Sequence, residues 1–317
     1  SGINGKFYPD GIMLNKSLSY IFPSPVFEYR ALFNNDEDLL GDMFADPYGE
    51  AVHSGTAYNW LYESTLRMKG NMMIVGTIPY PDEISIKLAA KRGIIVTDHH
   101  FDLLGSNTFR FPSSISNEWL WQTTPSVPTF VWKASMRSLY ENTNGEVVFS
   151  LGYRGLNDYA GPCQNCTQEE DGMVITQVIG NMTDWVNKEY GQNINKITYL
   201  WAEGITYFND GYLTIPDDVS IILTDNGNGI IKDTDQYANV SEGIYTHTAM
   251  YNGNANQLTE LVSPFRHFSE IGKFTSKSKK NKYAIINTSD LKPCLLSTAA
   301  VFCYIYNGNK CAGNGDP

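Results

Sequence analysis

The strongest constraint on the fold of this 317-residue chain is an alternation of strand-like and helix-like segments. Short runs rich in β-branched and aromatic residues are separated by longer segments with helical periodicity. Such an alternation predicts a parallel sheet built from right-handed crossovers. The eight expected strands begin near residues 26, 71, 93, 146, 196, 219, 243 and 282. Helices are expected at 54–69, 82–92, 129–143, 169–189, 204–211, 256–271 and from about 294, with a long loop at 105–128.

Eight strand–helix units in about 275 residues predict a (β/α)8 barrel, a TIM barrel of the α/β class. The apolar runs 94–96 and 221–223 are typical of strands buried on both faces. An open doubly wound sheet is the alternative, but no Gly-x-Gly-x-x-Gly follows the first strand to support nucleotide binding. The barrel is expected over 26–305. It would lie between an N-terminal segment, 1–25, interpreted as a remnant of a preceding domain, and a C-terminal tail, 306–317.

The charge balance excludes one class of partner. The chain has 23 Lys and Arg against 34 Asp and Glu, a formal net charge of −11. An acidic surface repels phosphate backbones, so we expect no nucleic-acid binding. The lysines at 273–282 lie among Ser, Thr and Asn and are interpreted as a solvated loop. No apolar run approaches the roughly 18 residues that a membrane-spanning helix needs.

Cysteines and glycosylation motifs favour a secreted glycoprotein. Cys163 and Cys166 form a C-x-x-C, but no second cysteine pair or histidine cluster completes a zinc site. Structural disulfides or inert thiols are therefore favoured, and neither a metal nor a cofactor is expected. Asn-x-Ser/Thr acceptor motifs, of which those at 165 and 181 are favoured, occur at Asn15, Asn165, Asn181, Asn239 and Asn287.

Polar residues recur where the expected strands end. In a (β/α)8 barrel these ends meet on one face, which carries the active site. Asp36, Asp158 and Glu203 are expected to converge there with Arg154. Two carboxylates that flank a glycosidic bond can hydrolyse it by acid–base catalysis, and an arginine can bind a substrate carboxylate through a forked pair. Tyr153, Trp201 and Tyr251 offer flat faces for sugar rings.

Some polar residues fit a structural role better. A metal site is disfavoured because His99 and His100 are adjacent on a strand and no H-E-x-x-H occurs. His100 and His267 are interpreted as structural. Asp217 and Asp218 follow a proline and are interpreted as turn residues at the opposite end of the barrel.

These motifs together resemble the barrel domain of glycoside hydrolase family 115, the xylan α-glucuronidases. The resemblance extends over about residues 26–300, and GYRGLND is its closest approach to a signature. The motifs, in the family's order, are YRALFNNDED (29–38), GIIVTDHH (93–100), GYRGLND (152–158), WAE (201–203), IPDDV (215–219), TDN (224–226), GIYTH (243–247) and INTSDLKP (286–293).

The resemblance implies a pocket and a reaction. It implies that Glu203 and Asp158 are the catalytic acid and base, in an order left open. The reaction would invert configuration and release α-linked (4-O-methyl)glucuronic acid from a xylan-type polysaccharide. The resemblance places the remaining pocket residues at Asp36, His99, Arg154, Asn226, and Tyr245 or Tyr251.

The chain also departs from the family, which keeps a second hypothesis open. Phe101 stands where the family usually has Glu, and Leu39 where it usually has Trp. The 226–229 loop lacks the family's usual aromatic residue. The alternative is a non-catalytic extracellular glycoprotein barrel that binds carbohydrate or serves as a structural subunit. Under either hypothesis the expected partners are a glycan, a second copy of the chain, or flanking domains.

Overall fold

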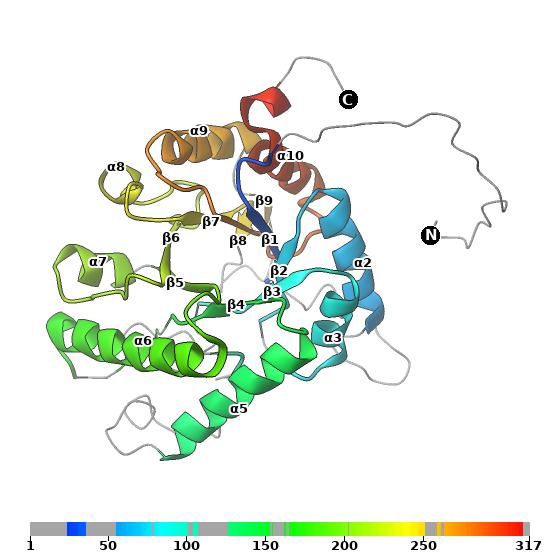
Figure 1. Cartoon of the computed structure of the whole chain (residues 1–317). Coiled ribbons are helices and arrows are strands. Elements are labelled where there is room, and N and C mark those ends of the chain that lie inside the picture. Colours follow the sequence, from blue (N-terminus) through cyan, green and yellow to red (C-terminus); the bar gives the residue numbers. More distant parts are fainter. Residues whose placement is uncertain are drawn as a thin grey trace.

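The chain folds around a closed barrel of parallel strands, as the alternation predicts (Figure 1). The computed structural model describes residues 24–35, 55–77, 79–100, 104–106, 126–152, 154, 162, 165–201, 203–250, 259–260 and 263–312. The strands pair in the cyclic order β1-β10-β7-β6-β5-β4-β3-β2. All eight expected strands are confirmed: β1 (Tyr29–Phe33), β2 (Met72–Ile74), β3 (Ile95–Thr97), β4 (Val147–Ser150), β5 (Lys196–Leu200), β6 (Ser220–Thr224), β7 (Gly243–His247) and β10 (Tyr283–Asn287).

Helices surround the barrel in chain order (Figure 1). They cover the outer face of the barrel. Along each strand, side chains alternate between an outer apolar layer beneath the helices and an inner apolar layer inside the barrel. On β1, Leu32 joins the outer layer beneath the helices, while Ala31 and Phe33 belong to the inner layer inside the barrel. The helices are α2 (Gly55–Arg67), α3 (Ile84–Lys91), α5 (Ser126–Asn142), α6 (Gln168–Tyr190), α7 (Glu203–Asn209), α8 (Thr234–Tyr237), α9 (Pro264–Thr275) and α10 (Leu295–Asn307).

Side-chain and backbone hydrogen bonds explain where α6 begins. The Thr167 hydroxyl accepts the backbone N–H of Glu170 at 3.2 Å, and the Glu170 carboxylate accepts the backbone N–H of Thr167 at 2.7 Å. This reciprocal capping box satisfies two N–H groups that the first turn leaves without helical partners. α6 therefore begins at Gln168, next to the expected start at 169.

The expected helix at 256–271 is placed wrongly at its N-terminal end. α9 begins only at Pro264, where the Ser263 hydroxyl accepts the backbone N–H of Phe265 at 3.3 Å. Thr259–Glu260 instead form β9, which pairs antiparallel with β8, Ala249–Met250. A proline in the first helical turn with a serine cap was the available start signal.

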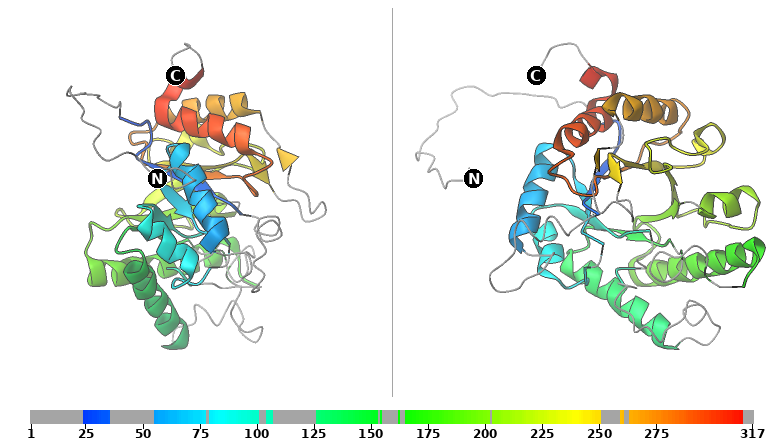
Figure 2. Two further views of the ribbon diagram at one scale, coloured as in Figure 1. Left: turned by 90° about the vertical axis from the view of Figure 1, so that its right-hand side faces the viewer. Right: turned by 180° about the vertical axis from the view of Figure 1, so that it is seen from behind.

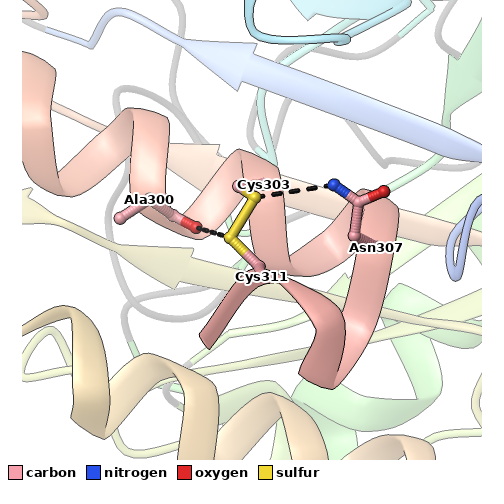
Figure 3. The surroundings of a disulfide bond; sticks show 4 residues. All are labelled: Ala300, Cys303, Asn307 and Cys311. Atoms are coloured by element: carbon pink, nitrogen blue, oxygen red, sulfur yellow. Dashed lines mark hydrogen bonds between the residues drawn. A yellow bond between two sulfur atoms is a disulfide. The ribbon is translucent and has the colours of Figure 1, made fainter. Parts of the chain in front are cut away.

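The C-terminal end of the barrel domain also differs from expectation. α10 continues past the expected boundary at residue 305, and the 3-10 helix η3, Gly308–Ala312, follows it. A disulfide between Cys303 and Cys311 ties η3 back to α10 (Figure 3). Cys166 is also disulfide-bonded, whereas Cys294 is buried and is not part of a disulfide. Structural disulfides are therefore part of this fold.

The last two helices lie side by side on the outside of the barrel (Figure 2). Phe268 of α9 stacks on Tyr304 of α10 with ring centroids 4.6 Å apart. Such offset aromatic contacts add to the burial of apolar area between packed helices. Within the described residues, no helix has both the length and the apolar character needed to cross a bilayer.

Close packing between neighbouring strands gives a test of the barrel. A Cβ at Gly243 of β7 would lie 2.7 Å from the Tyr283 carbonyl oxygen and 2.7 Å from Ile222 Cδ1. Gly243→Ala is therefore expected to lower the free energy of unfolding by about 1–3 kcal/mol, measured by denaturant titration. Gly180→Ala on α6 is the matched control, because its Cβ meets nothing within 4 Å. There alanine is expected to stabilise by about 0.5–1 kcal/mol. Equal effects at the two positions would contradict the strand packing.

Candidate active site

The ends of β4 and β5 bring an arginine and a glutamate into direct contact. Arg154 follows β4, and Glu203 opens α7 directly after β5. Arg154 Nε lies 2.6 Å from Glu203 Oε1, and Nη2 lies 3.0 Å from Oε2. The two side chains are only 14% and 16% exposed. A forked pair of this kind is among the stronger polar contacts in proteins, and it fixes the plane of both groups.

An aromatic cluster lies beside this ion pair at the carboxyl ends of β3, β5 and β7. His100 stacks on Trp201 with ring centroids 5.5 Å apart. Trp201 in turn lies 6.0 Å from the ring of Tyr245 and 5.4 Å from that of His247. His100, Tyr245 and His247 are buried. The mouth of the barrel therefore has a floor of aromatic and imidazole rings.

His99 also belongs to this floor. Its ring makes an edge contact with Phe33, 4.8 Å between centroids, and is 4% exposed. Burial lowers the pKa of His99 well below its usual value, and the nearby charges of His100, Arg154 and His247 lower it further. His99 is therefore a neutral imidazole at neutral pH.

A second carboxylate is held in the wall where β6 ends. Asp225 is 1% exposed and accepts five hydrogen bonds of 2.6–3.1 Å. The donors are the backbone N–H groups of Gly227, Gly229 and His247, the Thr246 hydroxyl and His247 Nδ1. Burial alone would raise the pKa of Asp225, but the His247 ring and these N–H donors outweigh it and hold the pKa below its usual value.

The contact between Asp225 and His247 orients an imidazole at the mouth. Asp225 Oδ1 lies 2.6 Å from His247 Nδ1. A carboxylate can only accept, so Nδ1 carries a proton. The imidazole ring of His247 packs against the rings of Trp201 and Tyr245, with centroids 5.4 and 5.1 Å away.

The predicted pocket residues have different positions. Tyr245 lies at the mouth but is 2% exposed, and its hydroxyl accepts the Asn287 amide at 2.7 Å, so it forms floor rather than open wall. Asn226 is exposed, and its amide oxygen accepts the backbone N–H groups of Asn228 and Ile230 at 3.0 and 3.4 Å. Asn226 thus stabilises its own loop, while the preceding Asp225 contacts the floor. Asp36, Asp158 and Tyr251 lie outside the described residues, as does Tyr153.

The assignment from sequence omits Asp225 and His247 from the pocket. The available signal was the period of two along β7. An inward-facing Tyr245 implies an inward-facing His247 two residues later. The pairing with Asp225 had no local signal, because it depends on two neighbouring strands ending side by side.

The glycosylation candidates divide by exposure. Asn165, Asn181 and Asn239 are exposed, so their amide nitrogens are open to modification. Asn287 is 1% exposed and its amide nitrogen donates to Tyr245. A glycan on Asn287 would have to replace this contact, because the side chain lies at the floor of the barrel mouth. Asn15 lies outside the described residues.

The described residues contain no cluster of three or more His, Cys, Asp or Glu side chains arranged to hold a metal ion. His267, interpreted as structural, is fully buried on α9, and its Nδ1 lies 3.2 Å from the Thr246 hydroxyl. His100, also interpreted as structural, instead lies in the aromatic floor against Trp201.

Comparison with known proteins places this barrel in a class. The sequence profile of glycosyl hydrolase family 115 matches residues 23–315. The chain therefore belongs to glycosyl hydrolase family 115, and a glycoside hydrolase function is supported. None of the curated proteins compared with it by sequence matches.

Two solved structures share the fold. One is a family GH115 4-O-methyl-alpha-glucuronidase with specificity for decorated arabinogalactans, with a TM-score of 0.76 and 21% identity over 95% of this chain. The chain spans 42% of the length of that protein. The other is a GH138 enzyme targeting pectin rhamnogalacturonan II, with a TM-score of 0.55 and 12% identity. It aligns with 90% of this chain, which spans 40% of its length. At these identities the likeness establishes the fold.

A further carboxyl group lies below the mouth, after β3. Asp98 Oδ2 is buried and has no hydrogen-bond partner among the described residues, while the Gly105 N–H bonds the same carboxyl group. Burial raises the pKa of Asp98 to about 7, and the Gly105 hydrogen bond offsets only part of that rise. Asp98 therefore keeps its proton to a higher pH than an exposed aspartate does.

This raised pKa predicts a pH-dependent stability. Unfolded Asp98 loses its proton near pH 4, while the folded group keeps it up to about pH 7. Its contribution is fully present below pH 4 and is lost as the pH rises to about 7. Asp98→Asn, which stays neutral, is expected to gain stability relative to wild type across this window. The gain is at most about 4 kcal/mol for a shift of about three pH units. Denaturant titrations at pH 4, 5.5, 7 and 8 check it, and a constant difference would contradict the burial of Oδ2.

Proposed function

We propose that this chain is the barrel of an inverting glycoside hydrolase that releases α-linked (4-O-methyl)glucuronic acid from a xylan-type polysaccharide. The observation that carries the proposal is the forked contact between Arg154 and Glu203 at the barrel mouth. The Arg154 fork already accommodates a planar carboxylate, so it can accept the carboxylate of a uronic acid in the same geometry. The name of the GH115 relative, a 4-O-methyl-alpha-glucuronidase, supports this substrate class.

The same contact suggests how substrate would prepare the catalytic group. A uronate that enters the fork competes with Glu203 for the Nε and Nη2 donors of Arg154. Displacement would free the Glu203 carboxyl group to act on the glycosidic oxygen or on a water molecule. In this proposal Glu203 and Asp158 form the acid–base pair. For inversion their carboxyl groups must lie about 6.5–9.5 Å apart, so that a water molecule fits between one of them and the sugar.

The aromatic floor supports a sugar ligand. Trp201 is only partly buried and stacks on His100, so an apolar face lies beside the ion pair. Sugar rings combine apolar C–H faces with hydroxyl groups, and a site with one flat apolar wall and a few charged groups suits them. We propose a glycan as the partner of this surface.

The catalytic proposal is tested with conservative variants. Glu203→Gln keeps the shape but removes acid–base chemistry and is expected to lower kcat for glucuronic-acid release about 10²–10⁴-fold. Arg154→Lys retains the charge but cannot form the fork, and we expect a loss of about tenfold or more in kcat/KM. The assay measures uronic acid released from decorated xylan and decorated arabinogalactan by the longest natural chain that contains these residues.

A surface pair of the same geometry provides the control. Arg137 on α5 holds Glu189 of α6 through contacts of 2.9 and 3.1 Å, with both side chains substantially exposed. Glu189→Gln breaks an equivalent fork far from the mouth and is expected to leave the release of uronic acid unchanged. If wild type binds the glycan but releases no uronic acid, the catalytic proposal is wrong and a non-catalytic carbohydrate-binding barrel takes its place.

We also propose that the protein is secreted and N-glycosylated. Two features support this proposal: exposed acceptor motifs at Asn165, Asn181 and Asn239, and a disulfide between Cys303 and Cys311. After expression in a glycosylating host, the intact mass is expected to exceed that of the bare 35.5 kDa chain and to fall on treatment with an N-glycosidase. A bare mass in that host would contradict the proposal.

A further inference from the structure

Strand β7 carries a polar side chain on each side of the barrel wall. Ile244 joins the outer apolar layer and Tyr245 the inner one. Because side chains alternate along a strand, Thr246 points outward to the helix layer and His247 points inward to the mouth. Both are buried, at 1% and 4% exposure.

A chain of hydrogen bonds crosses the wall at this point. His267 Nδ1 on α9 lies 3.2 Å from Thr246 Oγ1. Thr246 Oγ1 lies 2.8 Å from Asp225 Oδ2, and Asp225 Oδ1 lies 2.6 Å from His247 Nδ1. The path runs from a fully buried histidine under the outer helix, through the carboxylate in the wall, to the imidazole at the mouth.

The direction of each hydrogen bond can be assigned. The ionised Asp225 carboxylate only accepts, so Thr246 must donate its single hydroxyl proton to it. Toward His267 the Thr246 oxygen can then only accept, which requires a proton on His267 Nδ1. The His267 N–H polarises the Thr246 hydroxyl and makes it a stronger donor to Asp225, where this branch of the path meets the separate N–H donor of His247.

We propose that Thr246 and His267 are positioning residues that hold Asp225 so that it fixes the ring of His247 at the barrel mouth. The consequence for catalysis rests on the proposed function, but the effect on the His247 ring does not. Asp225 is the hydrogen-bond partner of Nδ1, so it fixes the proton on that nitrogen and, together with the ring contacts to Trp201 and Tyr245, the orientation of the ring. Without the Thr246 hydroxyl, Oδ2 keeps the His247 and Gly229 N–H groups but loses the link that anchors it to the helix layer.

Nuclear magnetic resonance of the histidine rings tests this inference directly. The chain has only five histidines, so single His→Gln variants assign each ring in spectra of ¹⁵N-labelled protein. In wild type, His247 is expected to show one protonated Nδ1 whose proton is shifted downfield and exchanges slowly with water. Thr246→Val removes the hydroxyl at nearly constant shape and is expected to broaden that resonance or shift it upfield. Thr246→Ser keeps a hydroxyl and is expected to preserve it.

Variants at the far end of the path give an independent test. His267→Asn keeps an N–H donor near the position of Nδ1, whereas His267→Leu removes it. The leucine variant is expected to reproduce the effect of Thr246→Val on the His247 resonance, and the asparagine variant to restore it at least in part. Thermal melting identifies any variant that fails to fold. If one of the two variant pairs, at Thr246 or at His267, is lost in this way, the other pair tests the inference by itself. A His247 resonance unchanged in both Thr246→Val and His267→Leu would overturn the inference.

Activity separates this inference from the proposed function. If both hold, Thr246→Val is expected to lower kcat/KM for uronic-acid release about tenfold, the loss of one hydrogen bond to a charged group, while Thr246→Ser retains most of it. If wild type is inactive but the His247 resonance responds as described, the proposed function fails and the positioning path stands. If wild type is active and the resonance does not respond, only the positioning path fails.

Discussion

The pairing of β1 with β10 is the constraint on which the rest of this structure depends. These strands come from opposite ends of the chain and run parallel over five residue pairs, from Tyr29 with Tyr283 to Phe33 with Asn287. Closure gives each of the eight barrel strands two neighbours, so the barrel itself has no open edge. It also brings all the carboxyl ends to one rim. Arg154 and Glu203, 49 residues apart, can meet only because their strands are adjacent in that closed wall.

The two rims of the barrel use charge differently. At the amino-terminal rim Lys196 is buried, and its ammonium donates to the Asn187 side chain and the Ile194 carbonyl at 2.9 and 3.1 Å. It also lies 3.2 Å from the Asp218 carboxylate, so this expected turn residue is in addition the partner of a buried cation. The ammonium thus bonds to protein acceptors, and satisfied hydrogen bonds of this kind stabilise a buried charge. At the opposite rim the Arg154–Glu203 pair remains partly open to water, where a ligand can reach it.

The wall itself connects the outer helices to the mouth. In a β-strand, neighbouring side chains point to opposite faces, so Thr246 and His247 are a single residue apart in sequence but lie on opposite sides of the barrel. Asp225 bridges them because it follows the adjacent strand and is long enough to bond both. The helix layer is therefore linked to the mouth through one buried carboxylate. Burial raises the pKa of Asp225, but the His247 ring and the N–H donors lower it by more, so the pKa lies below its usual value.

The sequence by itself determined the barrel, since the alternation of apolar runs with helical segments and the right-handed crossover leave few other arrangements for eight parallel strands. It also singled out Arg154 and Glu203, because polar residues at strand ends share a rim in this fold. The sequence did not determine which of these groups touch. The burial of Asn287 and the link from His267 to His247 each depend on neighbours far away in the chain. Only the tertiary structure decides these features, because burial and hydrogen bonding are properties of a packed environment, and local residue patterns carry no record of it.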